Sequence, residues 1–350
     1  MTDFFQEINV VASSGAIILF GGSSNERKVS VASAQHLSSI LPSAKLWFWS
    51  LDGSVFDVGS DDLARHEKPY DSEFNPLQAT KIAETVDKAL ERVGRDVVCL
   101  SLHGGDGENG WIQAKLEARK IPYTGSGSVS SQLAMDKSRS KDVVKSRGLL
   151  VAKQTLFKPT ETVSETLTSF QKSTGSIVVK PACDGSSSGL AFLKTHDDCK
   201  AWFNTNKQSS ALWLAEEELV GRELTVGVIS HQGMLMALPP SEVILEKNVH
   251  FDFQAKYHGV GNREVTPAEL TPLQTSAAQE VGLIAHAALG CYGYTRTDMI
   301  MTSAGFFYLE TNTLPGMTRA SFIPQQLKAA RIELQDFVLG QLDLARARYL

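Results

Sequence analysis

A hairpin pattern in the last fifth of the chain constrains the fold more than any other feature of the sequence. Two apolar segments, Tyr294–Met301 and Phe306–Asn312, flank the four residues Thr302-Ser303-Ala304-Gly305. A three-residue loop that ends in glycine closes β-hairpins, because glycine adopts the left-handed backbone conformation. We therefore predict two antiparallel strands joined by the loop Ser303-Ala304-Gly305.

This register places polar side chains opposite each other on one face of the hairpin. Asp298 is predicted to pair with Glu310 and Arg296 with Asn312, because side chains two positions apart in a strand share a face. Two facing carboxylates repel each other unless a cation lies between them. Mg²⁺ binds one or two carboxylates together with substrate phosphates, which predicts a metal–nucleotide site. The alternative is a solvated face of mixed charge, and a slip of one residue would separate the set.

The composition excludes several other classes of protein. The 350 residues are 42% hydrophobic and 21% charged, with a net charge of -5, so neither nucleic acid nor an acidic membrane is expected as the main partner. The acidic N-terminus and the lack of a long apolar run predict no signal peptide and no membrane span. The four cysteines do not form a CxxC pair and are expected to be reduced thiols in the cytoplasm.

The first part of the chain, residues 1–125, reads as one α/β domain. A buried strand, Ala16–Phe20, is followed by a tight turn and by a helical pattern from Arg27 to Ile40. A second strand, 96–102, leads into the glycine-rich turn 103–110. A helix from Trp111 to Arg119 and a short strand at 121–123 complete the domain.

The remainder divides into a small α+β module, 126–215, and a larger mixed domain, 216–350. A single helix rich in Lys and Arg is expected from about Ser130 to Arg147, and an apolar-periodic helix from Leu334 to Tyr349. The strands expected in between lie near Gln154–Phe157, Ser176–Lys180 and Gly189–Leu193, with further strands between Leu212 and Ile229.

Three basic or acidic clusters suit a nucleotide. Lys180 precedes a Gly/Ser-rich loop, 181–189, that could fold over phosphate oxygens, although the loop taken alone favours a simple hairpin turn. Lys137 offers a second phosphate contact, or else an exposed helix face. The acidic residues Glu216, Glu217 and Glu223 could bind a base and a ribose, or form a solvated strand end. The chain has no Walker A motif.

Several further positions have two interpretations. Gly316, in a Pro-Gly turn, permits close approach of the backbone to a ligand, and Ser321 opens a short helix whose N-terminus could seat a carboxylate. Glu26 fits a capping box with Ser23, and His103 could be an ordinary turn histidine.

Together and in this order, these segments closely resemble D-alanine–D-alanine ligases of the ATP-grasp superfamily. The resemblance runs from about residue 16 to about 330. It is carried by GGSSNERKVSVASA, LHGGDGENG, IPYTGSG, AMDKSRSK, VVKPACDGSSSG, GRELTVGV, FDFQAKY, TRTDM and LETNTLPGMTRASFIP.

The resemblance implies a fold and a reaction. The fold would combine α/β and α+β parts in a three-domain ATP-grasp architecture with an N-terminal Rossmann-like domain. The reaction would join two D-alanines through a D-alanyl phosphate at the expense of ATP, for peptidoglycan precursor synthesis. Two Mg²⁺ ions, which Mn²⁺ could replace, would assist. A homodimer in the cytoplasm is the family expectation.

The resemblance also assigns roles to residues. Lys137 and Lys180 would bind phosphates, and Glu216, Glu217 and Glu223 the adenosine. Asp298, Glu310 and Asn312 would hold the metals. Glu26, Ser186 and Tyr257 would place the first D-alanine and close a loop, with Arg296 and Gly316 at the reacting carbon. His103, Lys256, Ser321 and Phe322 would bind the substrates.

Two other functions stay open. Glu218 stands where many relatives have an apolar residue, and Phe322 replaces a frequent Leu. Both keep open an ATP-grasp ligase for other amino acids or for a D-alanine/hydroxy-acid pair, although Tyr257 favours the dipeptide over the ester. A non-catalytic nucleotide-binding relative is the third class, and the complete set of lysine, arginine and metal residues argues against it.

Overall fold

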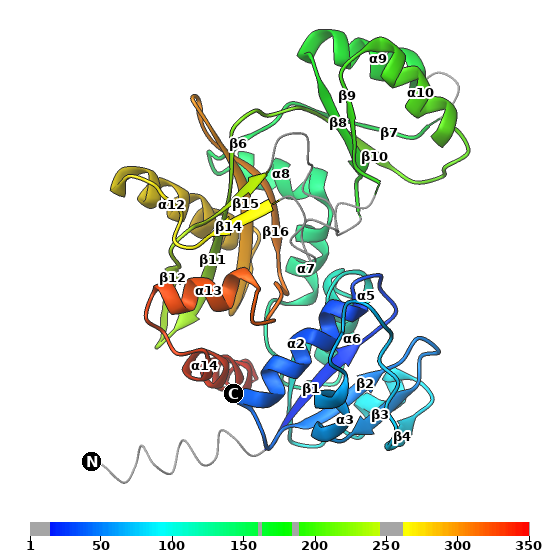
Figure 1. Ribbon diagram of the computed structural model, residues 1–350, viewed down its shortest axis with the longest axis vertical. Helices are drawn as coiled ribbons and strands as arrows, with labels where there is room; N and C mark the ends of the chain where they lie inside the picture. Colours follow the sequence, from blue (N-terminus) through cyan, green and yellow to red (C-terminus); the bar gives the residue numbers. More distant parts are fainter. Residues whose placement is uncertain (1–14, 160–162, 184–188, 246–261, 350) are drawn as a thin grey trace.

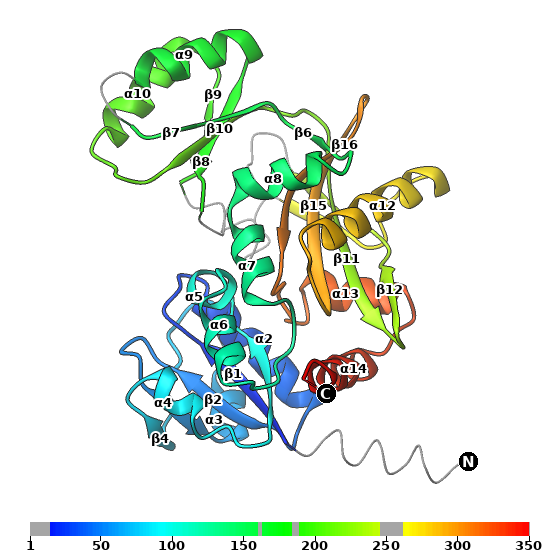
Figure 2. The same cartoon turned by 180° about the vertical axis from the view of Figure 1, so that it is seen from behind.

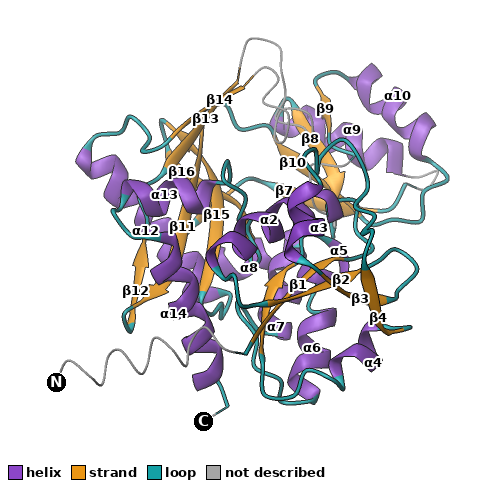
Figure 3. Cartoon of the chain, turned by 60° about the horizontal axis from the view of Figure 1, so that its bottom comes forward, coloured by secondary structure: helices purple, strands orange, loops and turns teal. Residues whose placement is uncertain are grey.

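The computed structural model describes residues 15–159, 163–183, 189–245 and 262–349. Its sheets form three separate units (Figure 3), which follow one another along the molecule (Figure 1). The N-terminal unit lies at one end, the small central unit at the other, and the C-terminal sheet between them (Figure 1). The mixed α/β architecture agrees with the predicted fold class.

The N-terminal unit is built on a five-stranded sheet in the order β4-β3-β2-β1-β5. β1 is parallel to β2 and β5, whereas β3 and β4 add antiparallel strands at one edge. All six residues of β1 are buried, as the apolar run predicts for a central strand. The strands are β1 (Ala16–Gly21), β2 (Lys45–Trp49), β3 (Val55–Val58), β4 (Ala79–Ala83) and β5 (Val97–Ser101). The helices are α2 (Arg27–Ile40), α3 (Ser60–Arg65), α4 (Val86–Leu90), α5 (Gly105–Glu108) and α6 (Trp111–Ala118).

The expected helix from Ser130 to Arg147 is in fact two helices. They are α7 (Ser128–Met135) and α8 (Lys137–Lys145), and the chain turns between them at Asp136, whose φ and ψ are -81° and 97°. The Asp136 carboxylate accepts the Arg139 N–H at 3.0 Å and so caps α8. The single-helix prediction was wrong because it overlooked this capping aspartate.

The central unit has a four-stranded sheet in the order β7-β10-β8-β9 and its own apolar core. In this core the Trp202 ring contacts both Phe157 and Trp213 edge to face. The predicted boundary at 215 falls inside β10. The elements are β7 (Gln154–Phe157), α9 (Val163–Thr174), β8 (Ile177–Pro181), β9 (Ala191–Leu193), α10 (His196–Asn206) and β10 (Trp213–Glu217).

The C-terminal unit is a sheet in the order β14-β13-β11-β15-β16-β6, with β12 paired to β11. α7 and α8 lie beside this sheet, and Ala134 and Val144 belong to its core although they precede the central unit in the chain. The elements are β6 (Leu150–Val151), β11 (Arg222–His231), β12 (Met234–Ala237), β13 (Ser241–Leu245), β14 (Asn262–Val265), α12 (Pro272–Ala288), β15 (Tyr294–Thr302), β16 (Gly305–Asn312), α13 (Phe322–Ala329) and α14 (Leu334–Ala347).

The hairpin of β15 and β16 has the predicted register at the polar residues. Asp298 pairs with Glu310 and Arg296 with Asn312. The loop, however, has two residues rather than three, because Thr302 pairs with Gly305. A bulge after Asp298 leaves Leu309 without an opposite partner, and this extra residue restores the register. The predicted loop length was wrong, whereas the predicted pairing of Asp298 with Glu310 and of Arg296 with Asn312 is confirmed.

The N-terminal and C-terminal units share one hydrophobic core. Buried residues of β1 and β5 belong to the same cluster as Leu314, Phe337 and Leu342 of the C-terminal part. Figure 2 shows α14 beside the N-terminal unit, away from the central one. The four cysteines are free, as predicted. In the part of the chain that the structure describes, no helix could span a membrane.

Candidate functional site

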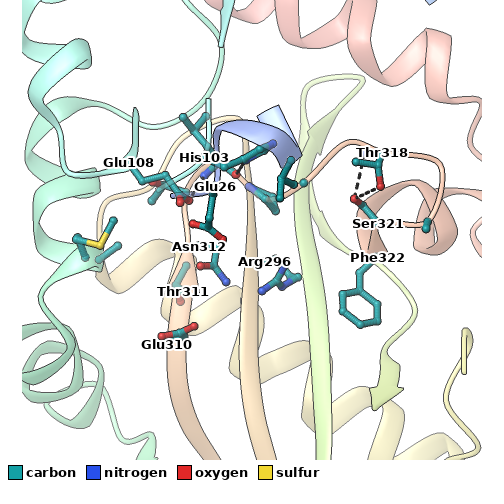
Figure 4. Close-up of a pocket in the computed structure, with 18 of the residues that line it drawn as sticks. Glu26, His103, Glu108, Arg296, Glu310, Thr311, Asn312, Thr318, Ser321 and Phe322 are labelled. Carbon is teal, nitrogen blue, oxygen red and sulfur yellow. Dashed lines mark hydrogen bonds between the residues drawn. The ribbon is translucent and has the colours of Figure 1, made fainter. Parts of the chain in front are cut away.

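A pocket opens where the N-terminal unit, α7 and the C-terminal sheet meet, and Figure 4 shows its walls. Nine of the predicted site residues line it, although they come from segments up to about three hundred residues apart. They are Glu26, His103, Lys137, Arg296, Glu310, Asn312, Gly316, Ser321 and Phe322. The fold therefore brings together side chains that the sequence patterns suggested one at a time.

Asp298 is the most heavily bonded carboxylate of the hairpin face. Arg296 donates to both of its oxygens, from Nε to Oδ1 at 2.9 Å and from Nη2 to Oδ2 at 2.8 Å. The Thr225 hydroxyl donates to Oδ1 at 2.5 Å, and the Asn312 amide to Oδ2 at 3.2 Å. Arg296 also lies over the ring of Phe322, 5.7 Å from its centroid. The guanidinium thus joins the predicted metal face to the predicted substrate pocket.

The oxygen donors of this face fit a hard divalent cation. Glu310 lies 3.3 Å from the Lys137 ammonium and opposite Asp298 in the hairpin. Among the described residues, no group of three His, Cys, Asp or Glu side chains is arranged as a metal cluster. The face instead offers two carboxylates and the Asn312 carbonyl oxygen, which would leave coordination positions of a cation open to phosphate oxygens. Mg²⁺ beside nucleotides is commonly bound in this way.

A buried charge cluster includes Lys180, one of the two predicted phosphate lysines. Glu216 accepts from Lys141, and the Lys180 ammonium lies 2.5 Å from its other oxygen. The side chain of Lys141 is completely buried and that of Glu216 is 5% exposed. Burial, and the nearby Lys180 charge, lower the pKa of Lys141, while Glu310 acts in the opposite direction. Lys137, Lys180 and Glu310 therefore belong to one electrostatic neighbourhood.

Glu26 directly precedes α2 and approaches the glycine-rich turn. It does not form the capping box with Ser23, because the helix begins at Arg27 and Glu26 makes no side-chain cap bond. A β-carbon on Gly104 would lie 2.5 Å from a Glu26 oxygen, and Gly104 has a φ of +62°. Glycine at position 104 therefore allows this carboxylate to reach the pocket.

His103 is buried beside Glu26, and the half-buried Glu108 lines the same part of the pocket (Figure 4). His103 contacts the Ser33 hydroxyl through Nε2 at 2.9 Å and the Leu314 carbonyl through Nδ1 at 2.9 Å. Burial lowers the pKa of His103, so the ring is neutral. Burial, together with the Glu26 charge, raises the pKa of Glu108 to about 7.

The loop after β16 and the start of α13 form the remaining wall. Ser321 precedes α13 but makes no cap bond to the helix. Its hydroxyl instead accepts the Thr318 N–H at 3.1 Å and lies 2.8 Å from the Thr318 hydroxyl (Figure 4). A β-carbon on Gly316 would lie 2.7 Å from this Ser321 oxygen, so a side chain at this position would require Ser321 to move.

Other predicted residues lie away from the pocket or outside the described part. Glu217 accepts the Lys153 N–H at 3.0 Å, and Glu223 pairs with Ile300 in the sheet. Neither lines the pocket. Ser186, Lys256 and Tyr257 lie outside the described residues.

Comparison with known proteins decides the family. Residues 16–126 match the family model described as "D-ala D-ala ligase N-terminus", and residues 143–342 match that of the C-terminus. The chain belongs to the D-alanine–D-alanine ligase family. It is 36% identical to the D-alanine--D-alanine ligase of Syntrophobacter fumaroxidans, over 94% of this chain and 96% of the relative.

Solved structures of family members have the same fold. The VanG D-Ala:D-Ser ligase of Enterococcus faecalis is 25% identical, with a TM-score of 0.76 over 96% of this chain and 99% of that one. The D-alanine–D-alanine ligase of Bacillus anthracis complexed with ATP has a TM-score of 0.69 at 23% identity, over 95% of this chain and 96% of that one.

Sequence reasoning missed three charged residues of this family member. Glu108 and Glu264 line the pocket, and Lys141 holds Glu216. Glu108 and Lys141 lie within two of the family motifs, HGGDGENG and AMDKSRSK. A charged residue inside such a motif is a signal from which a role in the site could have been predicted. Glu264 lies outside the family motifs. Burial raises its pKa, and Gln325 donates to its carboxylate at 3.0 Å.

Proposed function

We propose that this chain joins two D-alanines to form D-alanyl-D-alanine, with ATP as the energy source. The observation that carries the proposal is the hairpin register, in which Asp298 faces Glu310 and Arg296 faces Asn312 beside the pocket. The relatives named as D-alanine–D-alanine ligases cover nearly the whole chain, which supports the same substrates here.

The reaction has two transfers. A carboxylate oxygen of the first D-alanine attacks the γ-phosphorus of ATP, ADP leaves, and D-alanyl phosphate forms. The amine of the second D-alanine then attacks the acyl carbon, loses a proton, and inorganic phosphate leaves as the peptide bond forms. Each turnover consumes one ATP and releases one phosphate.

The protein's own residues stabilise charge at each stage. Lys137 and Lys180 are cations at the pocket and at the charge cluster behind it, where they can balance the phosphoryl oxygens. Arg296 and the Gly316 N–H would stabilise the oxyanion at the acyl carbon, a contribution that is worth roughly 10²–10³ in rate. Glu26 is a pocket carboxylate that can bind the ammonium of the first D-alanine.

Asp298, Glu310 and Asn312 would hold Mg²⁺, two ions per site, and the bound metal would neutralise phosphate charge. Their oxygen donors are the observation on which this assignment depends. We further propose a homodimer and a cytoplasmic location, with which the four free cysteines are consistent.

A phosphate-release screen tests the function. Purified protein with ATP and Mg²⁺ is given D-alanine, L-alanine, D-serine or D-lactate, alone and in pairs, and products are identified by mass spectrometry. We expect phosphate release with D-alanine as the sole amino acid, and the D-alanyl-D-alanine mass. Turnover only with D-alanine plus D-serine or D-lactate would move the specificity to the mixed product, and turnover only without D-alanine would contradict the proposal.

A further inference from the structure

The segment Leu314–Met317, which contains Gly316, is held by side chains of the N-terminal unit. Glu108 accepts the Leu314 N–H at 3.1 Å, and His103 Nδ1 lies 2.9 Å from the Leu314 carbonyl oxygen. Three residues further on, Ser33 accepts the Met317 N–H at 3.2 Å, and His36 Nδ1 lies 2.8 Å from the Met317 carbonyl oxygen. Both backbone polar groups of Leu314 and of Met317 are therefore bonded across the two units.

The chemistry of these groups fixes where the protons lie. A carbonyl oxygen can only accept, so Nδ1 of His103 and Nδ1 of His36 both carry the hydrogen. The neutral His103 ring then accepts at Nε2, and the Ser33 hydroxyl donates to it at 2.9 Å. Ser33 thus donates to His103 and accepts from Met317, so the direction of both hydrogen bonds of its hydroxyl is determined.

The bonds at Leu314 and Met317 leave little freedom to the two residues between them. Pro315 has a ring-locked φ angle and no N–H. Gly316 abuts the Ser321 hydroxyl on its other side. The Gly316 peptide is consequently fixed from both neighbours, and its place relative to Arg296 depends on bonds from α2, α5 and the turn after β5 as well as on the hairpin.

We infer that Ser33, His36 and Glu108 are positioning residues that act with His103 as a clamp on Leu314 and Met317, and so place the Gly316 N–H at the acyl carbon. The inference rests on the proposed function for its catalytic consequence. The partners in the clamp make several bonds each, which makes it stiff. Ser33 is buried, accepts one hydrogen bond and donates another, and the half-buried Glu108 accepts two.

His36 offers the cleanest test, because it is only partly buried and does not belong to the hydrophobic core. His36→Leu removes the donor to Met317, whereas His36→Asn keeps an N–H near the place of Nδ1. We expect kcat to fall about tenfold in His36→Leu with KM for ATP unchanged, since small displacements of catalytic groups can cost up to ~10²-fold. His36→Asn should recover most of the loss. Ser38→Ala is the matched control on the same helix, because Ser38 bonds only the Gln35 carbonyl among the described contacts.

A second pair of variants tests the other end of the clamp. Glu108→Gln keeps an acceptor oxygen, and Glu108→Met removes both, so kcat should fall further in the methionine variant than in the glutamine variant. Thermal unfolding of each variant shows whether it is folded. Unchanged kcat in folded His36→Leu and Glu108→Met overturns the inference, as does a rise in KM for ATP with kcat unaltered.

Amide hydrogen exchange tests the clamp independently of catalytic activity. The amides of Leu314 and Met317 should exchange faster in Glu108→Met and His36→Leu than in the wild type and in Ser38→Ala. If the wild type fails to use D-alanine, the proposed function fails, and the exchange rates still decide whether the clamp exists. Equal exchange in all four proteins contradicts it.

Discussion

Arg296 holds both carboxylate oxygens of Asp298 from two positions away on the same strand face. The two side chains are 18% and 13% exposed. Asp298 was predicted as a metal ligand and Arg296 as a group at the acyl carbon, and this ion pair couples the two roles. When no other ion or substrate is bound, the positive charge of Arg296 and the negative charge of Asp298 therefore neutralise each other.

This pairing predicts that Asp298→Asn destabilises the fold. The substitution leaves the guanidinium without its anion, and the loss of one partner from a mostly buried pair costs about 3 kcal/mol. Urea unfolding should give that decrease in the free energy of unfolding. The double variant Arg296→Met/Asp298→Asn should be more stable than Asp298→Asn alone. Wild-type stability in the single variant would contradict a structural role for the pair.

Glu310→Gln should abolish turnover and leave the fold intact. The amide keeps the shape of the side chain but loses the negative charge that a divalent cation requires. Phosphate release measures the turnover, and a Mn²⁺ titration of the ATP complex followed by electron paramagnetic resonance measures metal binding. Asp343→Asn on α14 is a control carboxylate far from the pocket. Near-normal activity in Glu310→Gln would remove this residue from the metal site.

The charge cluster at Glu216 predicts an unequal cost for its members. Glu216→Gln leaves the Lys141 and Lys180 ammonium groups facing each other in a buried place, whereas Lys141→Met leaves the Lys180–Glu216 pair. We expect Glu216→Gln to cost roughly 3–5 kcal/mol and Lys141→Met less. The double variant should cost less than the sum of the two, because the residues share one interaction. Additive costs in urea unfolding would show that Lys141 and Glu216 act independently.

The sequence predicted the strands and the hairpin register because alternation and turn residues are local signals. It failed at Asp136, where one aspartate caps a helix and turns the chain, since local periodicity continues across that residue. The bulge at Leu309 was also missed, because no pattern of residues in the sequence indicates it. The right pairing of Asp298 with Glu310 followed from an incorrect loop length that this bulge offset.

Site residues carried by motifs were predicted, and those that depend on tertiary packing were not. Glu108 lies inside a recognised motif, but its contact with Leu314 joins segments 206 positions apart. The clamp at Leu314 and Met317 appears only when the two units pack on a shared core. Lys141 was similarly indistinguishable from an exposed lysine on a basic helix until its burial was known.

Stability should depend on pH through His286 of α12. This histidine is buried, its Nδ1 lies 2.8 Å from the Thr295 hydroxyl, and burial lowers its pKa to about 4. The unfolded chain binds a proton near pH 6.5 whereas the folded protein does not, so the stability due to neutral His286 is present above pH 6.5. That stability is lost as the pH falls through about 4, by roughly 3 kcal/mol.

The measurement compares urea midpoints from pH 7 to pH 4 in the wild type and in His286→Gln. Glu108 contributes with the opposite sign, because its raised pKa favours the neutral acid in the folded state, and that stability is lost as the pH rises through about 7. The difference between the two proteins isolates His286, since Glu108 is present in both. We expect the wild type to lose stability relative to His286→Gln as the pH falls, and the exposed-site control His196→Gln to follow the wild type. Parallel curves for wild type and His286→Gln would show that His286 is protonated equally in the folded and unfolded states.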